Sequence, residues 1–372
     1  MGIDKIGKAQ EKAMAGNNNL GSAKAEKNDE FYTRLIDIEN ELRYYRRHFK
    51  GKTVLCNCDD PFESQFFKYF VMNFVKLGLK KLIATCYRGS PIAGTQLDFW
   101  NSSNVQSKGI PYKAIVTSVY DATGDGYLDM EDIKELFRIG KNELVELKED
   151  GDFRSDECLA LLDEADIVCT NPPFSLFHEY VMTLVKHNKK FIIIAPLNGI
   201  KYKHTFPLIK NGTMWLGVTS PKEFIASKNY TKRANLRVKK DGTTVAVFGN
   251  IYWVTNLDIK KRHEDLILVK RYDASSYPSY DNFDGIEVSD VKDIPYDYDG
   301  FMGVPISFLE VHNPEQFELI GRGEGNLAKE IGVTKNFRGR TDLAITLSDG
   351  THTCPYARIV IRNKHPEPRK QS

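Results

Sequence analysis

The segment Asn171-Pro172-Pro173-Phe174 brings together groups that could hold an amino group and make it nucleophilic. It follows the apolar run 167–169, which is typical of a buried strand. Proline has no N–H and a fixed φ, so the strand must end here, and the proline after Asn171 favours an extended conformation for that residue. The amide oxygen of Asn171 and the carbonyl of Pro172 then offer two fixed acceptors to an exocyclic amine, and Phe174 offers a face on which a planar base can stack.

These four residues match the Asn-Pro-Pro-Phe form of the motif of amino-methyltransferases, which transfer a methyl group from S-adenosylmethionine to adenine N6. The alternative is a strand that ends in a proline turn and has no catalytic role. Because a four-residue pattern also occurs by chance, the rest of the chain has to decide between the two interpretations.

A strand–helix–strand pattern lies nearer the N-terminus. Strands are predicted over 53–58 and 81–86, and the helix between them has an apolar stripe through Phe66, Phe70 and Phe74 and ends at Gly78. Such a βαβ unit places the turn after its first strand at the edge where open α/β sheets bind ligands. Asp59-Asp60-Pro61 occupies that turn, where a glycine-rich loop is the usual feature.

The remaining periodic segments indicate an α/β fold. Helices are predicted over 36–49, 133–137, 157–164 and 176–186, and strands over 113–120, 144–147, 165–170 and 190–195. The segments 214–218, 243–248 and 251–255 are expected to supply the last strands of the sheet. From about residue 272 the chain is rich in Tyr, Asp and Pro and no fold is predicted, although Lys335, Arg338 and Arg340 form a basic cluster there.

Composition narrows the class of protein. The chain has 372 residues, of which 41% are hydrophobic, and no apolar run is long enough for a membrane span. Residues 1–22 lack the apolar stretch of a signal peptide, and their Gly-, Asn-, Ala- and Lys-rich composition is typical of a disordered tail. The six cysteines show no zinc-site spacing, so we expect free thiols in a reduced, cytoplasmic protein.

Basic residues are concentrated between residues 221 and 271, where 12 Lys and Arg face 5 Asp and Glu, a local charge of +7 against +2 for the whole chain. This composition favours contacts with DNA phosphates and base edges. The candidate DNA-binding residues are Lys228, Lys232, Arg233, Arg237, Lys239 and Lys240. The alternative is a solvated surface hairpin.

The segment 121–132 has the spacing of a calcium loop. Its candidate ligands, at positions 1, 3, 5, 7, 9 and 12, are Asp121, Thr123, Asp125, Tyr127 through its carbonyl, Asp129 and Asp132. Asp instead of Glu at the last position, and a strand instead of a helix before the loop, are similar to the calcium loops of dockerin modules. The ion would have a structural role, and the alternative is an Asp-Gly turn that caps the helix over 133–137.

Taken together, these segments resemble the EcoRI-type adenine-specific DNA methyltransferases over roughly residues 27–362. The resemblance rests on the following motifs: Asn28-Asp-Glu-Phe-Tyr-Thr33, Cys56-Asn-Cys-Asp-Asp-Pro61, Gly151-Asp-Phe-Arg154, Asn171-Pro-Pro-Phe174, Gly249-Asn-Ile-Tyr-Trp253, Met302-Gly-Val-Pro-Ile-Ser-Phe308 and Asn313-Pro-Glu-Gln-Phe317. Their order along the chain is also that of the family.

The resemblance implies a role for each motif. Phe31, Tyr32 and Thr33 would hold the methionine end of S-adenosylmethionine, and Asn57, Asp59, Asp60 and Pro61 would line the cofactor turn. The Asp152 carboxylate would bind N6 of the cofactor's adenine, and Phe153 would pack on that base. No Gly-x-Gly follows the first strand and no acid ends the second, so no ribose-binding residue is assigned.

The resemblance also implies an organisation. Residues 23–258 would form a Rossmann-like methyltransferase domain with a basic insertion at 219–242, and 259–372 a target-recognition region. The substrate would be double-stranded DNA, whose target adenine must be flipped out of the stack before it can react. We expect a monomer, and a cognate restriction endonuclease encoded nearby is compatible with the resemblance without implying direct contact.

Two other classes remain open. An Asn-Pro-Pro methyltransferase can act on RNA or on protein glutamine, although the long basic and polar C-terminal half argues against a protein substrate. A DNA-binding homologue with an inactive cofactor site would explain the missing glycines. Binding of S-adenosylmethionine, and then methyl transfer to DNA, RNA or a glutamine peptide, distinguishes these classes.

Overall fold

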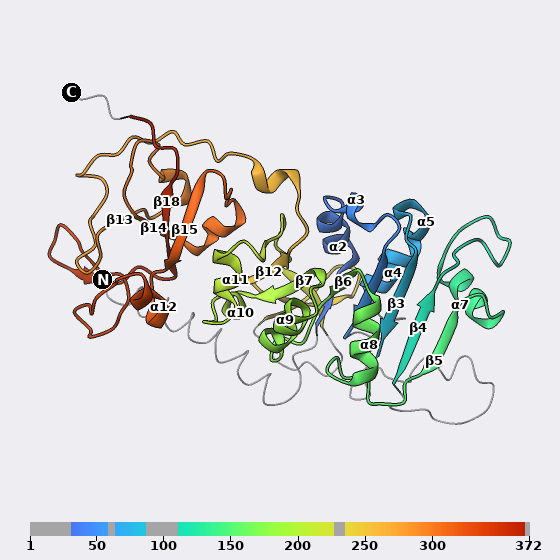
Figure 1. The fold of residues 1–372 in the computed structure, drawn as a ribbon. Helices are drawn as coiled ribbons and strands as arrows, with labels where there is room; N and C mark the ends of the chain where they lie inside the picture. Colours follow the sequence, from blue (N-terminus) through green and yellow to red (C-terminus); the bar gives the residue numbers. More distant parts are fainter. Residues whose placement is uncertain (1–30, 59–63, 87–110, 227–234, 369–372) are drawn as a thin grey trace. The chain divides into compact units, whose positions relative to one another are not determined.

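The computed structural model describes residues 31–58, 64–86, 111–226 and 235–368 (Figure 1). The described residues fall into two compact units. Unit 1 runs to Ile200 and continues over Thr219–Leu257, whereas unit 2 comprises Lys201–Val218 and the chain from Asp258 onward. Within the described ranges, no helix has the length and apolar character needed to cross a membrane.

Unit 1 is built on a mixed sheet, so the α/β class is confirmed. Its strands lie in the order β5-β4-β3-β2-β6-β7-β12. Four neighbouring strands are parallel: β3 (Lys81–Thr85), β2 (Thr53–Asn57), β6 (Ile167–Thr170) and β7 (Lys190–Pro196). The antiparallel strands are β4 (Tyr112–Val116), β5 (Glu143–Glu146) and β12 (Ile251–Thr255). The parallel strands therefore end at one edge, which we call the carboxyl edge.

The predicted βαβ unit is confirmed, with strand ends shifted by one residue. Helices α4 (Gln65–Met72) and α5 (Phe74–Leu77) connect β2 to β3. Ser64 caps α4 by accepting the Phe67 N–H at 3.4 Å. The aromatic stripe of α4 is buried, and Gly78 ends α5 with φ of 63°.

The other helices of unit 1 connect the remaining strands of the sheet. They are α7 (Met130–Arg138) between β4 and β5, α8 (Asp156–Glu164) before β6, α9 (Phe177–Lys186) between β6 and β7, and α10 (Leu197–Ile200) after β7. Each predicted helix in this part is present, α7 being longer than expected because Asp129 and Asp132 form a capping box at its start.

Two predictions for unit 1 were wrong. The helix expected over 36–49 is divided into α2 (Leu35–Leu42) and α3 (Arg46–Phe49), because Tyr45 turns into the core, where its hydroxyl donates to Glu41 at 2.9 Å. The strand expected over 243–248 does not join the main sheet. It forms part of a separate sheet in the order β1-β9-β11-β10. These strands are β1 (Phe31–Thr33), β9 (Glu223–Ala226), β11 (Thr244–Val247) and β10 (Leu236–Val238).

Unit 2 has its own sheet, which no pattern in the sequence predicts. The strands lie in the order β13-β14-β18-β15, namely β13 (Ile286–Glu287), β14 (Met302–Pro305), β18 (Arg358–Asn363) and β15 (Phe317–Arg322). Unit 2 also contains shorter elements: α11 (Phe206–Lys210), β8 (Trp215–Leu216), η2 (Lys260–His263), η3 (Val291–Asp293), η4 (Ile306–Glu310), α12 (Gly325–Glu330), and the hairpin of β16 (Ile345–Thr346) and β17 (His352–Thr353).

Candidate active site

Asn57 and Asn171 lie at the ends of two neighbouring strands on the carboxyl edge. Asn57 is the last residue of β2, and Asn171 directly follows β6. The Thr170 hydroxyl donates to the Asn57 carbonyl, which fixes the two strand ends together. Asn171 is only 8% exposed, so its carboxamide sits in a site that is largely closed to water.

The residues after Asn171 form a rigid turn into α9. Pro172 is buried, Pro173 and Phe174 are half-buried, and the Pro173 carbonyl accepts the Leu176 N–H at 3.0 Å. The two prolines thus end β6 as expected, and the ring of Phe174 keeps an accessible surface. This arrangement can present two acceptors and an aromatic face to one planar amine.

Helix α9 also fixes Asn57. The hydroxyl of Tyr180 donates to Asn57 Oδ1, and burial raises the pKa of Tyr180 well above its ordinary value, so the phenol stays a neutral donor. This bond orients the carboxamide of Asn57, whose amide nitrogen can act as a donor. Sequence reasoning missed Tyr180, which looks like one more apolar-face residue of an amphipathic helix.

The segment 151–154 packs against the end of β3, beside β2. Gly151 has φ of +76°, and a Cβ there would lie 2.3 Å from the Cys86 carbonyl oxygen. Phe153 is buried and makes an edge contact with Tyr180, at 5.0 Å between ring centroids. The structure therefore brings Asp152 and Phe153 next to Asn57 through Tyr180.

Asp152 is held by a neighbouring arginine. Arg154 donates to its carboxylate at 2.8 Å from Nε and 2.6 Å from Nη2, and also pairs with Glu179 on α9 at 3.3 Å. These bonds from Arg154 lower the pKa of Asp152, which is therefore an ionised acceptor near neutral pH. Glu179, like Tyr180, has no recognisable signal in the sequence.

Strand β1 brings Tyr32 and Thr33 into unit 1. Thr33 pairs with Phe224 of β9, and β1 contacts α4, the helix that follows β2. Thr33 is 2% exposed, and its hydroxyl has no hydrogen-bond partner among the described residues. Because an unsatisfied buried hydroxyl costs free energy, this group fits a site that a polar ligand completes.

Some of the predicted residues lie outside the described ones. These are Asp59, Asp60, Pro61, Lys228, Lys232 and Arg233, together with the proposed tail over 1–22. Directly before the turn, Cys58 has φ of 91°, a conformation that favours glycine. Cys58 therefore has a glycine-like backbone conformation directly after β2. Phe31 lies on β1, opposite Ala226.

The described DNA-binding candidates, Arg237, Lys239 and Lys240, lie on β10 and directly after it. Arg237 and Lys240 are exposed, whereas Lys239 pairs with Glu223 of β9 at 2.6 Å. Part of the local positive charge is therefore neutralised within unit 1, and Arg237 and Lys240 are the more accessible cations.

In the segment 121–132 the carboxylates bind backbone N–H groups. Asp121 accepts from Gly124 at 2.6 Å and from Gly126 at 2.9 Å, and Asp125 accepts from Tyr127 at 2.9 Å. Asp129 caps α7, while Asp132 accepts from Ala122, Thr123 and Asp129. These bonds match the turn-and-cap alternative. In the ranges that the structure describes, no group of three or more His, Cys, Asp or Glu is placed to hold a metal ion, and calcium binding stays a prediction.

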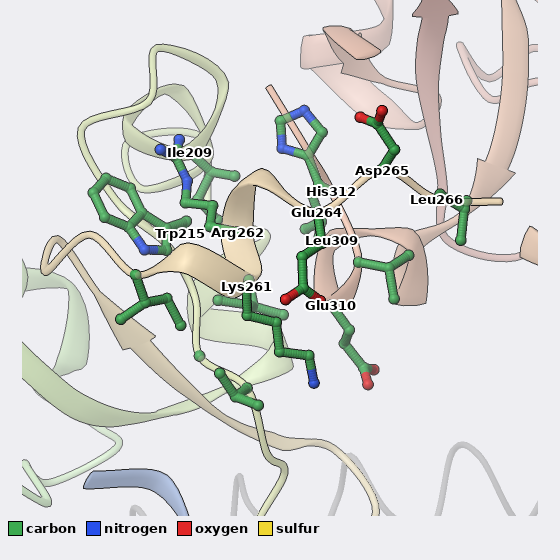
Figure 2. A pocket seen from close by; sticks show the side chains of 15 residues that line it. Ile209, Trp215, Lys261, Arg262, Glu264, Asp265, Leu266, Leu309, Glu310 and His312 are labelled. Atoms are coloured by element: carbon green, nitrogen blue, oxygen red, sulfur yellow. The ribbon is translucent and has the colours of Figure 1, made fainter. Parts of the chain in front are cut away.

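A pocket of about 160 Å³ lies within unit 2 (Figure 2). The Arg262 guanidinium stacks over the Trp215 ring at 3.9 Å on one side of it, and His312 lies among the other lining residues. None of the predicted catalytic or cofactor residues lines this pocket.

Comparison with known proteins supports the same assignment. The family model "Adenine-specific methyltransferase EcoRI" matches residues 19–364. The Type II methyltransferase M.EcoRI of Escherichia coli is 44% identical over 356 residues, covering 94% of this chain and 98% of the relative. M.MpnI of Mycoplasma pneumoniae is 38% identical and covers 80% of this chain and 83% of the relative. No solved structure matches the chain. The chain belongs to the EcoRI family of adenine-specific methyltransferases.

Proposed function

We propose that this protein transfers a methyl group from S-adenosylmethionine to N6 of an adenine in duplex DNA, at the carboxyl edge of β2 and β6. The observation that carries the proposal is the position of Asn171. It is buried at the end of β6, and Thr170 fixes it beside the strand end that carries Asn57. The family match supports the adenine target, and the relatives' names describe Type II methyltransferases.

The residues around Asn57 fit the cofactor. Asn57 Nδ2 and the ionised Asp152 can bind polar groups, Phe153 can pack on an adenine ring, and the unpartnered Thr33 hydroxyl can bind the methionine end. The cofactor's sulfonium supplies an already activated methyl group, so the protein needs no nucleophile of its own. Its contribution is positioning and electrostatics.

The residues around Asn171 fit the target base. An adenine must leave the helical stack to reach this buried site, at a cost of a few kcal/mol. Phe174 would stack on the flipped base, and Asn171 Oδ1 with the Pro172 carbonyl would accept from N6. These two bonds would direct the amine lone pair toward the cofactor's methyl group, and N6 would lose a proton to solvent after the transfer.

We further propose that residues 23–258 act as a Rossmann-like methyltransferase domain with its basic insertion at 219–242, and that 259–372 recognise the target. The parallel order β3-β2-β6-β7, with ligand-binding candidates at its carboxyl edge, supports the first assignment. The separate sheet of unit 2 supports the second.

The test is methyl transfer from labelled S-adenosylmethionine to duplex DNA, RNA and a glutamine peptide, followed by analysis of the modified nucleosides or residues. The proposal predicts N6-methyladenine in DNA alone. Label in RNA or in glutamine would support one of the other methyltransferase classes. Binding of DNA without any binding of S-adenosylmethionine would support the inactive homologue.

A further inference from the structure

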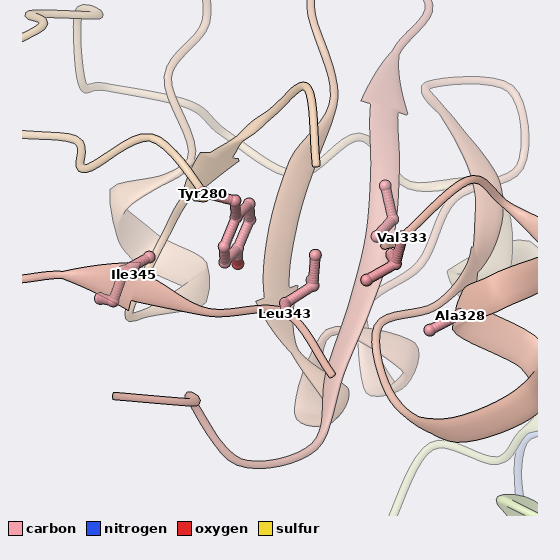
Figure 3. Close-up of a cluster of buried hydrophobic side chains, with 6 residues drawn as sticks. Tyr280, Ala328, Val333, Leu343 and Ile345 are labelled. Atoms are coloured by element: carbon pink, nitrogen blue, oxygen red, sulfur yellow. The ribbon is translucent and has the colours of Figure 1, made fainter. Parts of the chain in front are cut away.

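A loop in unit 2, residues 334–342, is anchored at both ends in one hydrophobic cluster. Val333 precedes the loop and Leu343 follows it, and they are 3% and 1% exposed. Both belong to a cluster with Tyr280, Ile345 and others, shown in Figure 3. The chain thus leaves the core, makes a short excursion and returns to the same core.

One asparagine also ties the two ends together by hydrogen bonds. Asn282 Nδ2 donates to the carbonyls of Thr334 and Asp342, each at 2.9 Å, and Asn282 Oδ1 accepts the Ala344 N–H at 3.0 Å. Asn282 is buried, so these bonds are shielded from water. The span of the loop is therefore fixed.

A second asparagine organises the tip. Asn336 Oδ1 accepts the backbone N–H groups of Arg338 at 2.8 Å and Arg340 at 3.2 Å, while its Nδ2 donates to the Asp342 carbonyl at 3.1 Å. Gly339 lies between the two arginines with φ of +69°, the left-handed conformation that such a tight turn needs. The backbone is ordered without help from the arginine side chains.

The loop presents an aromatic ring with a cation beside it. Phe337 is 50% exposed, which is unusual for a ring on a rigid turn. The Arg338 guanidinium lies 5.1 Å from its centroid, and the His352 ring of β17 lies 5.3 Å from it. Contact with Phe337 restricts the orientations of the Arg338 guanidinium.

The loop carries a net positive charge. Lys335, Arg338 and Arg340 are exposed, and the one acidic residue of the loop, Asp342, accepts the Gly325 N–H at 3.0 Å. Across the described ranges, no ion pair involves any of the three. Other arginines of unit 2 do have carboxylate partners: Arg322 pairs with Glu324, Arg358 with Glu287 and Arg362 with Glu318.

We propose that the loop 335–340 recognises base edges of the DNA, with Arg338 and Arg340 contacting guanine O6 and N7. This inference rests on the proposed function and identifies the residues that determine which DNA sequence is methylated. A phosphate contact requires only a nearby cation, which a mobile lysine supplies. Guanine recognition requires a guanidinium plane held in a fixed orientation, and the ordered turn with the Phe337 ring provides it.

The experiment begins by sequencing the methylated positions in DNA treated with the wild-type protein, which defines the recognition site. Next, kcat/KM is measured on a duplex with this site and on duplexes with each base pair of the site replaced in turn. For Arg338→Ala we expect a decrease of at least about tenfold on the intact site. Discrimination at one G·C position should disappear, while discrimination at the other positions is retained.

Two further variants sharpen the result. Arg338→Lys keeps the charge but not the bidentate geometry, so it should lose discrimination at the same position. Arg362→Ala is the matched control, because Arg362 is also an exposed arginine near an aromatic ring, 5.9 Å from Phe301, but has a carboxylate partner. It should keep wild-type discrimination at every position. Equal S-adenosylmethionine affinity and melting temperature establish that the variants are folded.

Equal slowing of all duplexes by Arg338→Ala would overturn the proposal in favour of phosphate contacts, and so would a recognition site without a G·C pair. Arg340→Ala is measured on the same duplexes, and unchanged discrimination in both Arg338→Ala and Arg340→Ala would also overturn the proposal, while leaving the proposed function intact. If the wild-type protein methylates no DNA, the proposed function itself fails.

Discussion

At the scale of single residues, the proposed site depends on further side chains that orient the residues predicted from the sequence. The sequence shows polar side chains that can bind a ligand, namely Asn57, Asp152 and Asn171. The roles of Tyr180 and Arg154, which orient Asn57 and Asp152, are visible only in the fold, because they follow from the contacts of α9 with the end of β2 and with the segment 151–154. The residue types of the proposed site could therefore be recognised in the sequence, but the contacts that support them could not.

Tyr180→Phe tests this support. It removes the donor to Asn57 Oδ1 and leaves a buried acceptor unsatisfied, at a cost of about 1–3 kcal/mol. If Asn57 binds the cofactor, the affinity for S-adenosylmethionine should fall several-fold or more, as measured by calorimetry.

Tyr45→Phe is the matched control, because Tyr45 is also a buried tyrosine that donates to one acceptor, Glu41. It should lower the melting temperature without changing cofactor affinity. Cofactor affinity that is unchanged in Tyr180→Phe would exclude the proposed role of Asn57.

At the scale of elements, the close approach of the segment 151–154 to the end of β3 positions Asp152 and Phe153, the proposed cofactor residues. Gly151→Ala would place a Cβ 2.3 Å from the Cys86 carbonyl oxygen, at a φ that L-residues rarely adopt. We expect destabilisation by more than about 1 kcal/mol and weaker cofactor binding, because Asp152 and Phe153 must shift.

Gly140→Ala separates the effect of backbone strain from the effect of the close approach to Cys86. Gly140 has a similar φ of +71°, but a Cβ at this position would have no other atom within 4 Å, so its variant carries only the backbone strain. Urea unfolding and cofactor titration of both variants provide the comparison. Equal decreases in stability and cofactor affinity in the two variants would mean that the approach to β3 has no part in the site.

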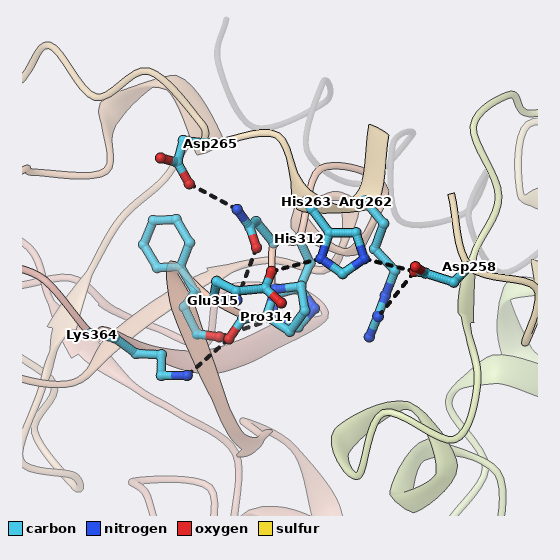
Figure 4. A network of polar contacts seen from close by, with 10 residues as sticks. Asp258, Arg262, His263, Asp265, His312, Pro314, Glu315 and Lys364 are labelled. Carbon is cyan, nitrogen blue, oxygen red and sulfur yellow. Dashed lines mark hydrogen bonds and ion pairs between the residues drawn. The ribbon is translucent and has the colours of Figure 1, made fainter. Parts of the chain in front are cut away.

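In unit 2, one histidine joins two elements. His263 of η2 bonds Asp258 through Nε2 at 2.7 Å and Glu315 through Nδ1 at 2.9 Å (Figure 4). Hydrogen bonds to Asp258 and Glu315 raise the pKa of His263 above its ordinary value of about 6.5. Because the folded pKa is the higher one, the stabilisation is fully present below pH 6.5 and is lost as the pH rises through the folded pKa.

The wild-type protein should therefore exceed His263→Gln in urea midpoint at pH 6, and the difference should shrink by pH 9. The effect is modest, since the imidazole is 37% exposed. A difference that grows with pH would contradict the assigned protonation.

Sequence patterns predict elements whose signals lie within a short stretch of chain. The βαβ unit over 53–86 could be predicted because its buried strands, its aromatic stripe and Gly78 are all visible in neighbouring residues. The sheet to which the strand at 244–247 belongs could not be predicted. That strand pairs with β9, and β9 pairs with β1, which lies about 190 residues earlier in the sequence. Most strands of unit 2 and its 3₁₀ turns are too short for a periodic signal, whereas the six-residue strands β15 and β18 were missed.

At the scale of the whole molecule, the net charge is only +2, so a DNA-binding surface must come from a local group of exposed cations such as Arg237 and Lys240. Replacing Arg237 and Lys240 by Ala should weaken binding to all DNA sequences alike and flatten the salt dependence by roughly 0.9 for each phosphate that the variant no longer neutralises. Lys239→Ala should have a smaller effect, since Glu223 already pairs with Lys239. An unchanged slope in the Arg237 and Lys240 double variant would support the solvated hairpin.

The central claim is that Asn171 holds the reacting amine in a DNA adenine methyltransferase. The most direct measurement is single-turnover methyl transfer to duplex DNA by wild type and Asn171→Ala, at saturating S-adenosylmethionine. Removal of one preorganised acceptor should slow transfer about 100-fold or more, with little change in cofactor affinity. Methylation of adenine by Asn171→Ala at close to the wild-type rate would contradict the account.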